Sequence, residues 1–187
     1  MSLKIIDTAI STERADEVHQ ARLMLLLRHT ADRGDGSVEG ITKLAKLDFL
    51  LRYPLYLERM FNQLNKTRTR PLRVKKQSYE EHTVESKMIR FRYGPWDERY
   101  RRWIALLVSK GLANTYLKGR TVHVRLTTAG LELAEQLAND PAFTDLDERS
   151  KLISKSVGSK SGEWLKKTIY EVVPELTGMA WGEHIEP

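Results

Sequence analysis

The sequence predicts a mainly α-helical protein with one two-stranded β-hairpin and a helical C-terminal extension. Two periodicities support this fold class. In several stretches of the 187-residue chain, apolar residues recur at spacings of three and four, as on the buried side of an amphipathic helix. In 121–126 they alternate with polar residues instead, as in a half-buried strand. Glycine and proline residues separate these stretches and mark their ends.

The first part of the chain predicts three helices. Ser11 or Thr12 can cap the first helix, which ends at the glycine-rich break at 34–36. Pro54 ends the second helix, because a residue before proline is pushed out of helical geometry. The third helix is short and precedes a polar, basic loop. The apolar residues with helical spacing are Val18, Ala21 and Leu25 in the first, Ile41, Leu44, Ala45, Leu47 and Leu51 in the second, and Leu57, Phe61 and Leu64 in the third.

A fourth helix, a hairpin and a fifth helix are predicted to follow one another without spare residues. The fourth helix is expected over 96–110, because Pro95 suits a helix start and Gly111 supplies the left-handed residue that stops it. The hairpin covers 112–126, and a threonine at 127–128 caps the fifth helix. The apolar stripe of the fourth helix is Trp96, Tyr100, Trp103, Ile104, Leu107 and Val108.

The C-terminal extension, residues 141–187, predicts a short polar helix, a linker and a final helix. Serine, glycine and lysine dominate 154–162, which is predicted to be a flexible linker. This stretch lacks the glycine spacing of a phosphate-binding loop, since Ser154 and Ser159 stand where that motif needs glycine. The final helix runs from about Glu163 to Val173, and its apolar residues must dock on their own core or on a partner.

Composition excludes several classes of function. The chain has no cysteine, which excludes disulfides, thiolate nucleophiles and cysteine-ligated metal sites. No apolar run approaches the ~18 residues of a membrane span. The first residues lack the apolar centre of a secretory signal. We therefore expect a cytoplasmic protein without a membrane partner.

No coherent catalytic or metal-binding motif is evident. The five histidines lack the spacing of metal ligands, so we expect them to be structural. Glu80, Glu81 and Glu85 lack the histidine or aspartate residues that would complete an acid–base or magnesium site, and a solvated helix face explains them better. We therefore expect no enzymatic activity, no cofactor and no metal. A nuclease that uses the three glutamates stays open as an alternative.

The net charge of +6 lies in one segment of the chain. Residues 66–92 hold nine basic and three acidic residues, and the two signs cancel elsewhere. Such an excess attracts phosphate groups whatever the base sequence, or an acidic protein surface, whereas a solvated loop is the plainer interpretation. The candidate nucleic-acid-binding residues are Lys66, Arg68, Arg70, Arg73, Lys75 and Lys76 in this segment, with Lys118 and Arg120 at the hairpin turn.

Arginine and aromatic residues beside the basic segment are candidates for a protein interface. Both residue types dominate the energetics of interfaces. Trp96, at the start of its helix, is the tryptophan of that helix that we expect to be most exposed, and local packing is the alternative role. The candidate partner-binding residues are Arg90, Arg92, Tyr93, Trp96 and Trp164.

The elements around the hairpin resemble a winged helix-turn-helix. The residues that carry the resemblance are a helix that ends in KGL at 110–112, a hairpin tip with GR at 119–120, and the run LTTAGL at 126–131. The order of helix, hairpin and helix matches that pattern.

This resemblance implies a winged-helix domain at 1–140 with a separate C-terminal extension. It gives 96–110 the position of the recognition helix and 118–120 that of the wing. An insertion of about 55–93, with the basic segment at 65–93, departs from the compact form, so DNA-reading residues are not carried over.

Three further blocks extend the resemblance over most of the chain. They are EGITKLAKLDFLLRYP at 39–54, VESKMIRFRYGPWD at 84–97, and SGEWLKKTIY at 161–170. Together they resemble the small middle component of bacterial ABC-three-component systems, the group that includes the Lamassu anti-phage defence operons.

This family resemblance implies a non-catalytic accessory subunit. Its partners would be an SMC-like ABC ATPase and a nuclease-type effector, and it would help the ATPase sense or hold double-stranded DNA. The alternative is a stand-alone winged-helix transcription regulator, which should dimerise and bind a palindromic site.

Overall fold

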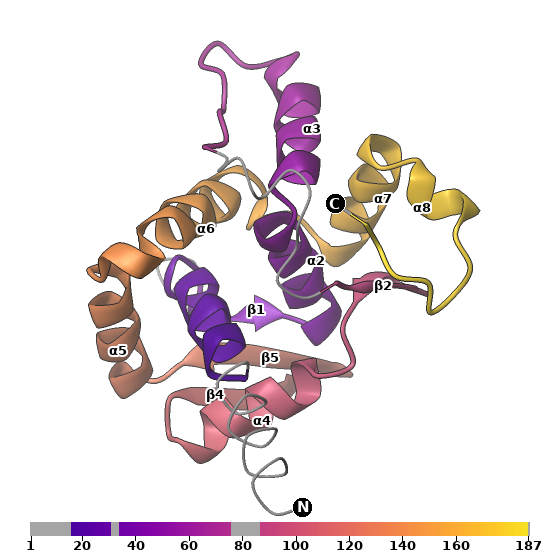
Figure 1. Ribbon diagram of the computed structural model, residues 1–187. Coiled ribbons are helices and arrows are strands. Elements are labelled where there is room, and N and C mark those ends of the chain that lie inside the picture. Colours follow the sequence, from indigo (N-terminus) through magenta and orange to yellow (C-terminus); the bar gives the residue numbers. More distant parts are fainter. Residues whose placement is uncertain (1–15, 31–33, 76–86, 187) are drawn as a thin grey trace, which may run out of the picture.

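A computed structural model describes residues 16–30, 34–75 and 87–186 of the chain. Within them the fold is mainly helical (Figure 1). The helices are 16–28, α2 (Ile41–Arg52), α3 (Pro54–Asn65), α4 (Tyr100–Ser109), α5 (Thr128–Ala138), α6 (Thr144–Val157), α7 (Gly162–Val172) and α8 (Glu175–Gly178). The strands are β1 (Val38–Glu39), β2 (Ile89–Phe91), β3 (Gly94–Trp96), β4 (Ala113–Lys118) and β5 (Thr121–Leu126). The predicted caps Ser11 and Thr12, and also Lys76, Glu80, Glu81 and Glu85, lie outside the described residues.

Two small antiparallel sheets accompany the helices. The first has the order β1-β5-β4, with Thr115 and Val38 on either side of Val124. It confirms the predicted hairpin at 112–126. In the second, β2 and β3 form a hairpin that was not predicted, with Ile89 opposite Trp96.

Helix α2 lies at the centre of the core (Figure 1). Its residues 44–52 are all buried, and it contacts α3, α6, α7, β1 and β3. The final helix, α7, docks on its own chain, because it contacts α2 and α3 and buries Leu165 and Ile169 completely. The C-terminal extension therefore shares one core with the elements before it.

The fourth helix begins at Tyr100, and the prediction that it begins at Trp96 is wrong. Residues 94–96 form β3 instead, where Pro95 lies opposite Arg90. Proline is tolerated there because β3 is an edge strand, which can lack one N–H donor. Gly94 has a φ of 112°, which other residues avoid, so the chain turns before a helix can start. Trp96 is consequently absent from the stripe of α4, whose other predicted end, Val108, is exposed.

The predicted linker at 154–162 is also wrong in its first part. Helix α6 continues to Val157, and both Ser154 and Val157 are buried. Ser154 Oγ donates a hydrogen bond to the His29 carbonyl oxygen at 2.6 Å, so the serine has a partner inside the core. The polar composition suggested a linker, but Ile153 and Val157 continue the four-residue spacing of a helix. Only residues 158–161 connect α6 to α7.

Thr127 caps α5, as predicted: its Oγ1 accepts a hydrogen bond from the Gly130 N–H at 3.0 Å. The first turn of α5 passes very close to the chain before β4. A Cβ atom on Gly130 would lie 1.9 Å from the Leu112 carbonyl oxygen. Position 130 therefore requires glycine for reasons of space.

Replacing Gly130 by alanine should lower the free energy of unfolding by about 2 kcal/mol, because α5 must move away from a rigid backbone atom. Urea denaturation measures the change. The matched control is Gly178→Ala, since no atom lies within 4 Å of the added Cβ there. We expect the control to stay within about 0.5 kcal/mol of the wild type. Equal effects of the two substitutions would contradict the prediction.

Candidate partner interface

The C-terminal residues 182–185 pair with β2 and turn the β2–β3 hairpin into a three-stranded sheet, called here the hairpin sheet. Its third strand is held by backbone hydrogen bonds: Arg90 N–H donates to Glu183 O, Gly182 N–H to Arg90 O, and Ile185 N–H to Met88 O, each at 2.8 Å. An antiparallel bridge joins Ile89 to His184. Segments about 90 residues apart in the sequence thus form one surface.

The inner face of the hairpin sheet packs on the core. Met88 and Ile185 point inward and are buried. The Tyr53 hydroxyl accepts a hydrogen bond from the Met88 N–H at 2.8 Å and donates one to Ile185 O at 2.9 Å. Burial raises the pKa of Tyr53 to about 12, so the hydroxyl keeps the proton it donates. From the inner face of the sheet, the Tyr53 hydroxyl therefore links the third strand to the Met88 backbone directly before β2.

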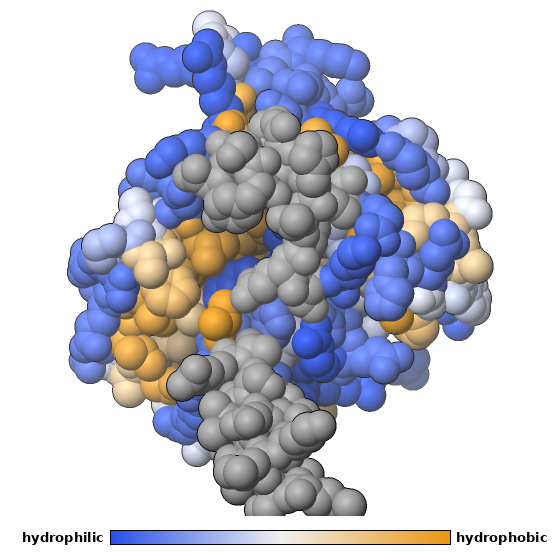
Figure 2. Space-filling view, viewed as in Figure 1, coloured by the Kyte–Doolittle hydropathy of each residue, from blue (hydrophilic) through white to orange (hydrophobic). Residues whose placement is uncertain are grey.

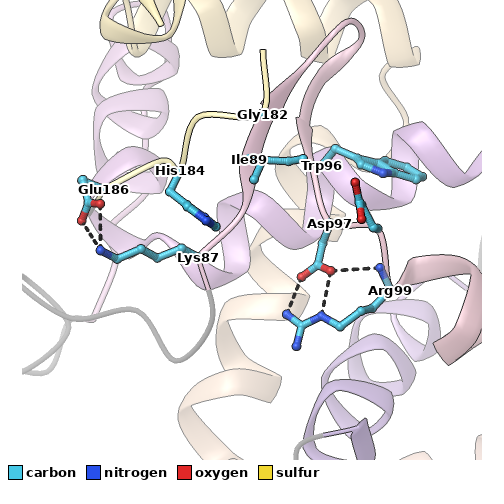
Figure 3. A pocket seen from close by; sticks show the side chains of 9 residues that line it. Lys87, Ile89, Trp96, Asp97, Arg99, Gly182, His184 and Glu186 are labelled. Carbon is cyan, nitrogen blue, oxygen red and sulfur yellow. Dashed lines mark hydrogen bonds and ion pairs between the residues drawn. The ribbon is translucent and has the colours of Figure 1, made fainter. Parts of the chain in front are cut away.

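The outer face carries a row of side chains across all three strands. Trp96, Ile89 and His184 are cross-strand neighbours, and they line one groove (Figure 3). Phe91 lies next to this row, with its ring centroid 6.3 Å from that of Trp96. Phe91 is 41% exposed and Tyr93, in the turn, 50% exposed. The outer face therefore exposes two aromatic side chains, Phe91 and Tyr93, beside the half-buried Ile89 and Trp96. Adjacent exposed aromatic groups beside a groove are typical of an interaction site.

The groove on this face has a volume of about 630 Å³. Two ion pairs border it, Lys87 with Glu186 and Arg99 with Asp97 (Figure 3). A second, smaller pocket of about 130 Å³ adjoins it. Trp96 lines both. The residues around the smaller pocket are Thr42, Phe91, Tyr93, Gly94, Pro95, Trp96 and Arg101.

Asp97 holds the wall of the groove in place. Its carboxylate accepts hydrogen bonds from Arg52 Nη1 at 2.9 Å and from Arg99 Nη2 at 2.8 Å. Burial alone would raise the pKa of Asp97, but the hydrogen bonds from Arg99 and the charge of Arg52 hold that pKa at about 2. The carboxylate is therefore charged at neutral pH and anchors the segment between β3 and α4.

Asp48 is the buried centre of the same charge network. One carboxylate oxygen accepts from Arg22 Nε at 2.7 Å; the other accepts from Arg52 Nε at 2.8 Å and from the Tyr100 hydroxyl at 2.5 Å. Burial would raise the pKa of Asp48, but the two guanidinium groups overcome this and lower it. The network ties helix 16–28, α2, the groove wall and α4 together. Sequence periodicity missed it because charged residues were assigned to solvent.

His19 lies beside this network in the core. Its ring packs against that of Trp103 in a tilted arrangement, with centroids 4.4 Å apart. Burial and the nearby charges of Arg22 and Arg52 lower the pKa of His19 to about 3. The folded protein therefore keeps this histidine neutral well below pH 6.5.

We expect stability to fall by about 2 kcal/mol between pH 6.5 and 4.5, because unfolded His19 gains a proton in this range and folded His19 does not. The unfolded state then binds more protons, so stability rises with pH. Asp48 and Asp97 have lowered pKa values and lose their contribution only below about pH 4. Urea denaturation at several pH values should show this fall in the free energy of unfolding for the wild type but not for His19→Phe. The control is His184→Phe, which changes an exposed histidine; its stability should fall with falling pH as that of the wild type does.

The structure separates the five predicted partner-binding residues. Trp96 lies on the outer face, with Tyr93 and Arg92 at the turn, where the Arg92 guanidinium lies 5.5 Å from the Tyr93 ring. Arg90 is half-buried and donates from Nε to Leu176 O at 2.8 Å, so it holds the C-terminal segment. Trp164, on α7, is half-buried beneath Lys160 and lines neither pocket. Sequence reasoning missed Ile89, Phe91 and His184.

The predicted nucleic-acid-binding residues lie at opposite ends of the molecule. Residues 66–75 form an exposed loop beyond α3, whereas Lys118 and Arg120 lie at the turn of β4–β5, near α4 (Figure 1). Lys76 lies outside the described residues. The structure therefore does not gather these residues into one surface.

A cluster of serine, histidine and aspartate lies where the 34–37 loop meets β4 and β5. Asp35 accepts hydrogen bonds from the hydroxyls of Ser37 and Tyr116, and Ser37 Oγ lies 2.9 Å from His123 Nδ1. The aspartate therefore contacts the serine and tyrosine hydroxyls. In a hydrolase triad the acid contacts the histidine instead and orients it toward the serine. This cluster fastens the loop to the sheet.

No family model, curated protein or solved structure matches the chain. Among the described residues, no three histidine, aspartate or glutamate side chains converge as a metal site would require. None of the helices in that part of the chain is long and apolar enough to span a membrane. The chemistry of the hairpin sheet is therefore the basis for inferring function.

Proposed function

We propose that the chain is a non-catalytic accessory subunit of an SMC-like ABC ATPase defence complex and that it docks a protein partner on the outer face of the hairpin sheet. The observation that carries the proposal is the pair of exposed aromatic side chains, Phe91 and Tyr93, beside the half-buried Trp96 and two pockets. The block at 84–97, which contributes to the family resemblance, supplies both strands of this hairpin. The same block thus carries the resemblance and the surface.

The partner surface should combine an apolar anchor with acidic residues. The small pocket has mostly apolar walls and accepts one apolar side chain. Arg101 lines its rim and Arg92 lies in the adjacent turn, so acidic groups beside the anchor would find charged partners. Aromatic and arginine residues around a desolvated pocket are the usual composition of an interface hot spot.

The order of the elements supports a winged-helix interpretation of the fold, which is part of this proposal. Helix 16–28, β1, α2, α4 and the β4–β5 hairpin follow one another in the order of a winged helix. The pairing of β1 with β5 gives the sheet order β1-β5-β4 of such a domain. In this interpretation α3, the loop at 66–75 and the β2–β3 hairpin are inserted between the second and third helices. The insertion, and not the wing, then carries the partner surface.

A stand-alone transcription regulator is the second candidate, and the exposed face of α4 favours it. Arg101 and Arg102 are exposed there, and Lys118 and Arg120 project from the adjacent wing. Arg102 is engaged by Asp16 at 2.7 Å, which offsets part of this charge. A regulator of this type should form a dimer on half-sites about one DNA turn apart.

Affinity purification of the tagged chain from its native operon separates the two candidates. We expect a large coiled-coil ATPase to be recovered with it at a fixed stoichiometry, identified by mass spectrometry and confirmed by size exclusion. Recovery of a dimer of the chain alone, which retards a specific promoter fragment, would overturn the accessory-subunit proposal. Intrinsic ATP turnover or DNA cleavage by the purified chain would overturn it as well.

A further inference from the structure

We infer that the loop at 66–73, called here the basic loop, is a binding site for the phosphodiester backbone of a nucleic-acid duplex. This inference depends on the proposed function only for placing the site in a defence complex; the binding of a duplex does not depend on it. The loop projects beyond α3 at the end of the molecule opposite α4, and Figures 1 and 2 show it as a hydrophilic protrusion. Its basic residues Lys66, Arg68, Arg70 and Arg73 are all exposed.

The loop is closed at its base by one side chain. Asn65 Nδ2 donates to Leu72 O at 2.9 Å, and the Leu72 N–H donates to Asn65 Oδ1 at 2.7 Å. Leu72 and Val74 pack against the core, so the chain is attached directly after the loop. A closed loop loses less conformational freedom on binding than an open one. The four cations are therefore presented on a preorganised support.

Among the described residues, no carboxylate forms an ion pair with the cations of the loop, Lys66, Arg68, Arg70 and Arg73. Lys66 Nζ donates a hydrogen bond to the uncharged Gln63 side chain at 2.8 Å. The nearest cation along the chain, Lys75, does pair with Asp145 at 2.7 Å. From Arg59 to Tyr79 the sequence has no acidic residue.

The chemistry of the loop favours a duplex backbone over other polyanions. Its residues 66–71 are Lys, Thr, Arg, Thr, Arg and Pro, without a large apolar side chain that could anchor a protein interface. Single-strand binding needs aromatic side chains on which bases stack, and the loop has none. Arginine and lysine with neighbouring hydroxyls are the groups that contact phosphates without reading sequence.

Fluorescence anisotropy of the purified chain with labelled 24-base-pair duplexes tests the inference. We expect two unrelated DNA sequences to bind equally, with log K falling against log salt concentration by a slope of about 3 to 4, from four phosphate contacts. The triple variant Arg68→Ala, Arg70→Ala and Arg73→Ala should bind at least tenfold more weakly at 100 mM salt and have a slope lower by about 3. Circular dichroism checks that the variant is folded.

The matched control removes the same charge elsewhere on the surface, as Lys110→Ala, Lys155→Ala and Lys167→Ala, because these three exposed cations lie outside the proposed sites. It should keep the slope and an affinity within twofold of the wild type. Asn65→Ala keeps every charge but opens the loop, and should weaken binding while leaving the slope unchanged.

Duplex RNA and single-stranded DNA of the same length complete the test. Binding of both duplexes supports a backbone site, and binding of DNA alone narrows it to the DNA duplex. The inference would be overturned if the two triple variants lost equal affinity for the duplex, or if the wild type preferred the single strand. A wild-type slope below 1 for log K against log salt concentration would overturn it as well. Recovery of the ATPase by the basic-loop variant would show that partner docking is independent, so this site and the proposed function can fail separately.

Discussion

Replacing Asp48 by alanine should lower the free energy of unfolding by about 3–5 kcal/mol, because removing one partner leaves buried charges without compensation. Asp48 is fully buried and contacts two guanidinium groups and the Tyr100 hydroxyl. Arg52 keeps Asp97, but Arg22 loses the carboxylate that it contacts at 2.7 Å. Urea denaturation at pH 7 measures the loss.

Two further variants make this prediction specific. Asp48→Asn keeps the shape of the side chain and part of its hydrogen bonding but removes the charge. Its free energy of unfolding should therefore lie between those of the wild type and Asp48→Ala. Asp145→Ala breaks the exposed pair with Lys75 and should cost less than about 1 kcal/mol. If Asp48→Ala were as mild as Asp145→Ala, the buried network would not be the main electrostatic support of the fold.

The network also links the core to the candidate interface. Arg52 contacts Asp48 and Asp97 together, and Asp97 fixes the wall of the groove. A change at Asp48 is thus passed to the hairpin sheet through one side chain. The buried charges fix the position of the segment between β3 and α4, which a purely apolar core would leave less specified.

Local sequence patterns predicted the elements that depend on local interactions. Apolar spacing predicted α2, α3, α5 and α7, alternation predicted β5, and the cap at Thr127 is a contact between residues three apart. The start of α4 was wrong because Pro95 suits both a first helical turn and an edge strand, and only the pairing of β3 with β2 decides between them.

The candidate interface could be predicted only in part. Arg92, Tyr93 and Trp96 stand out by residue type. His184 joins the same face through pairing with Ile89, about 95 residues away, and nothing in the short stretch before the C-terminus marks it as a strand. The contacts of Asp48 with Arg22 and Tyr100 are equally non-local. The family resemblance predicted a role for the chain but no geometry.

The double variant Phe91→Ala and Tyr93→Ala should weaken assembly with the proposed ATPase partner about 100-fold, since two exposed aromatic side chains at an interface each contribute roughly 1–2 kcal/mol. Both rings are 40–50% exposed in the free chain, so their removal should leave its stability nearly unchanged. Binding of the purified partner, measured by biolayer interferometry, gives the dissociation constants.

Trp181→Ala is the control for this variant. Trp181 is 67% exposed and lines neither the groove nor the small pocket, so its loss should change the dissociation constant less than twofold. Unfolding measured in parallel separates an interface effect from a folding effect. Trp96→Ala should weaken both partner binding and the stability of the fold, because Trp96 also packs on Tyr100 with ring centroids 5.4 Å apart. If the double variant bound as tightly as the wild type, the partner would have to dock on another surface, such as the exposed face of α4 and the turn of β4–β5.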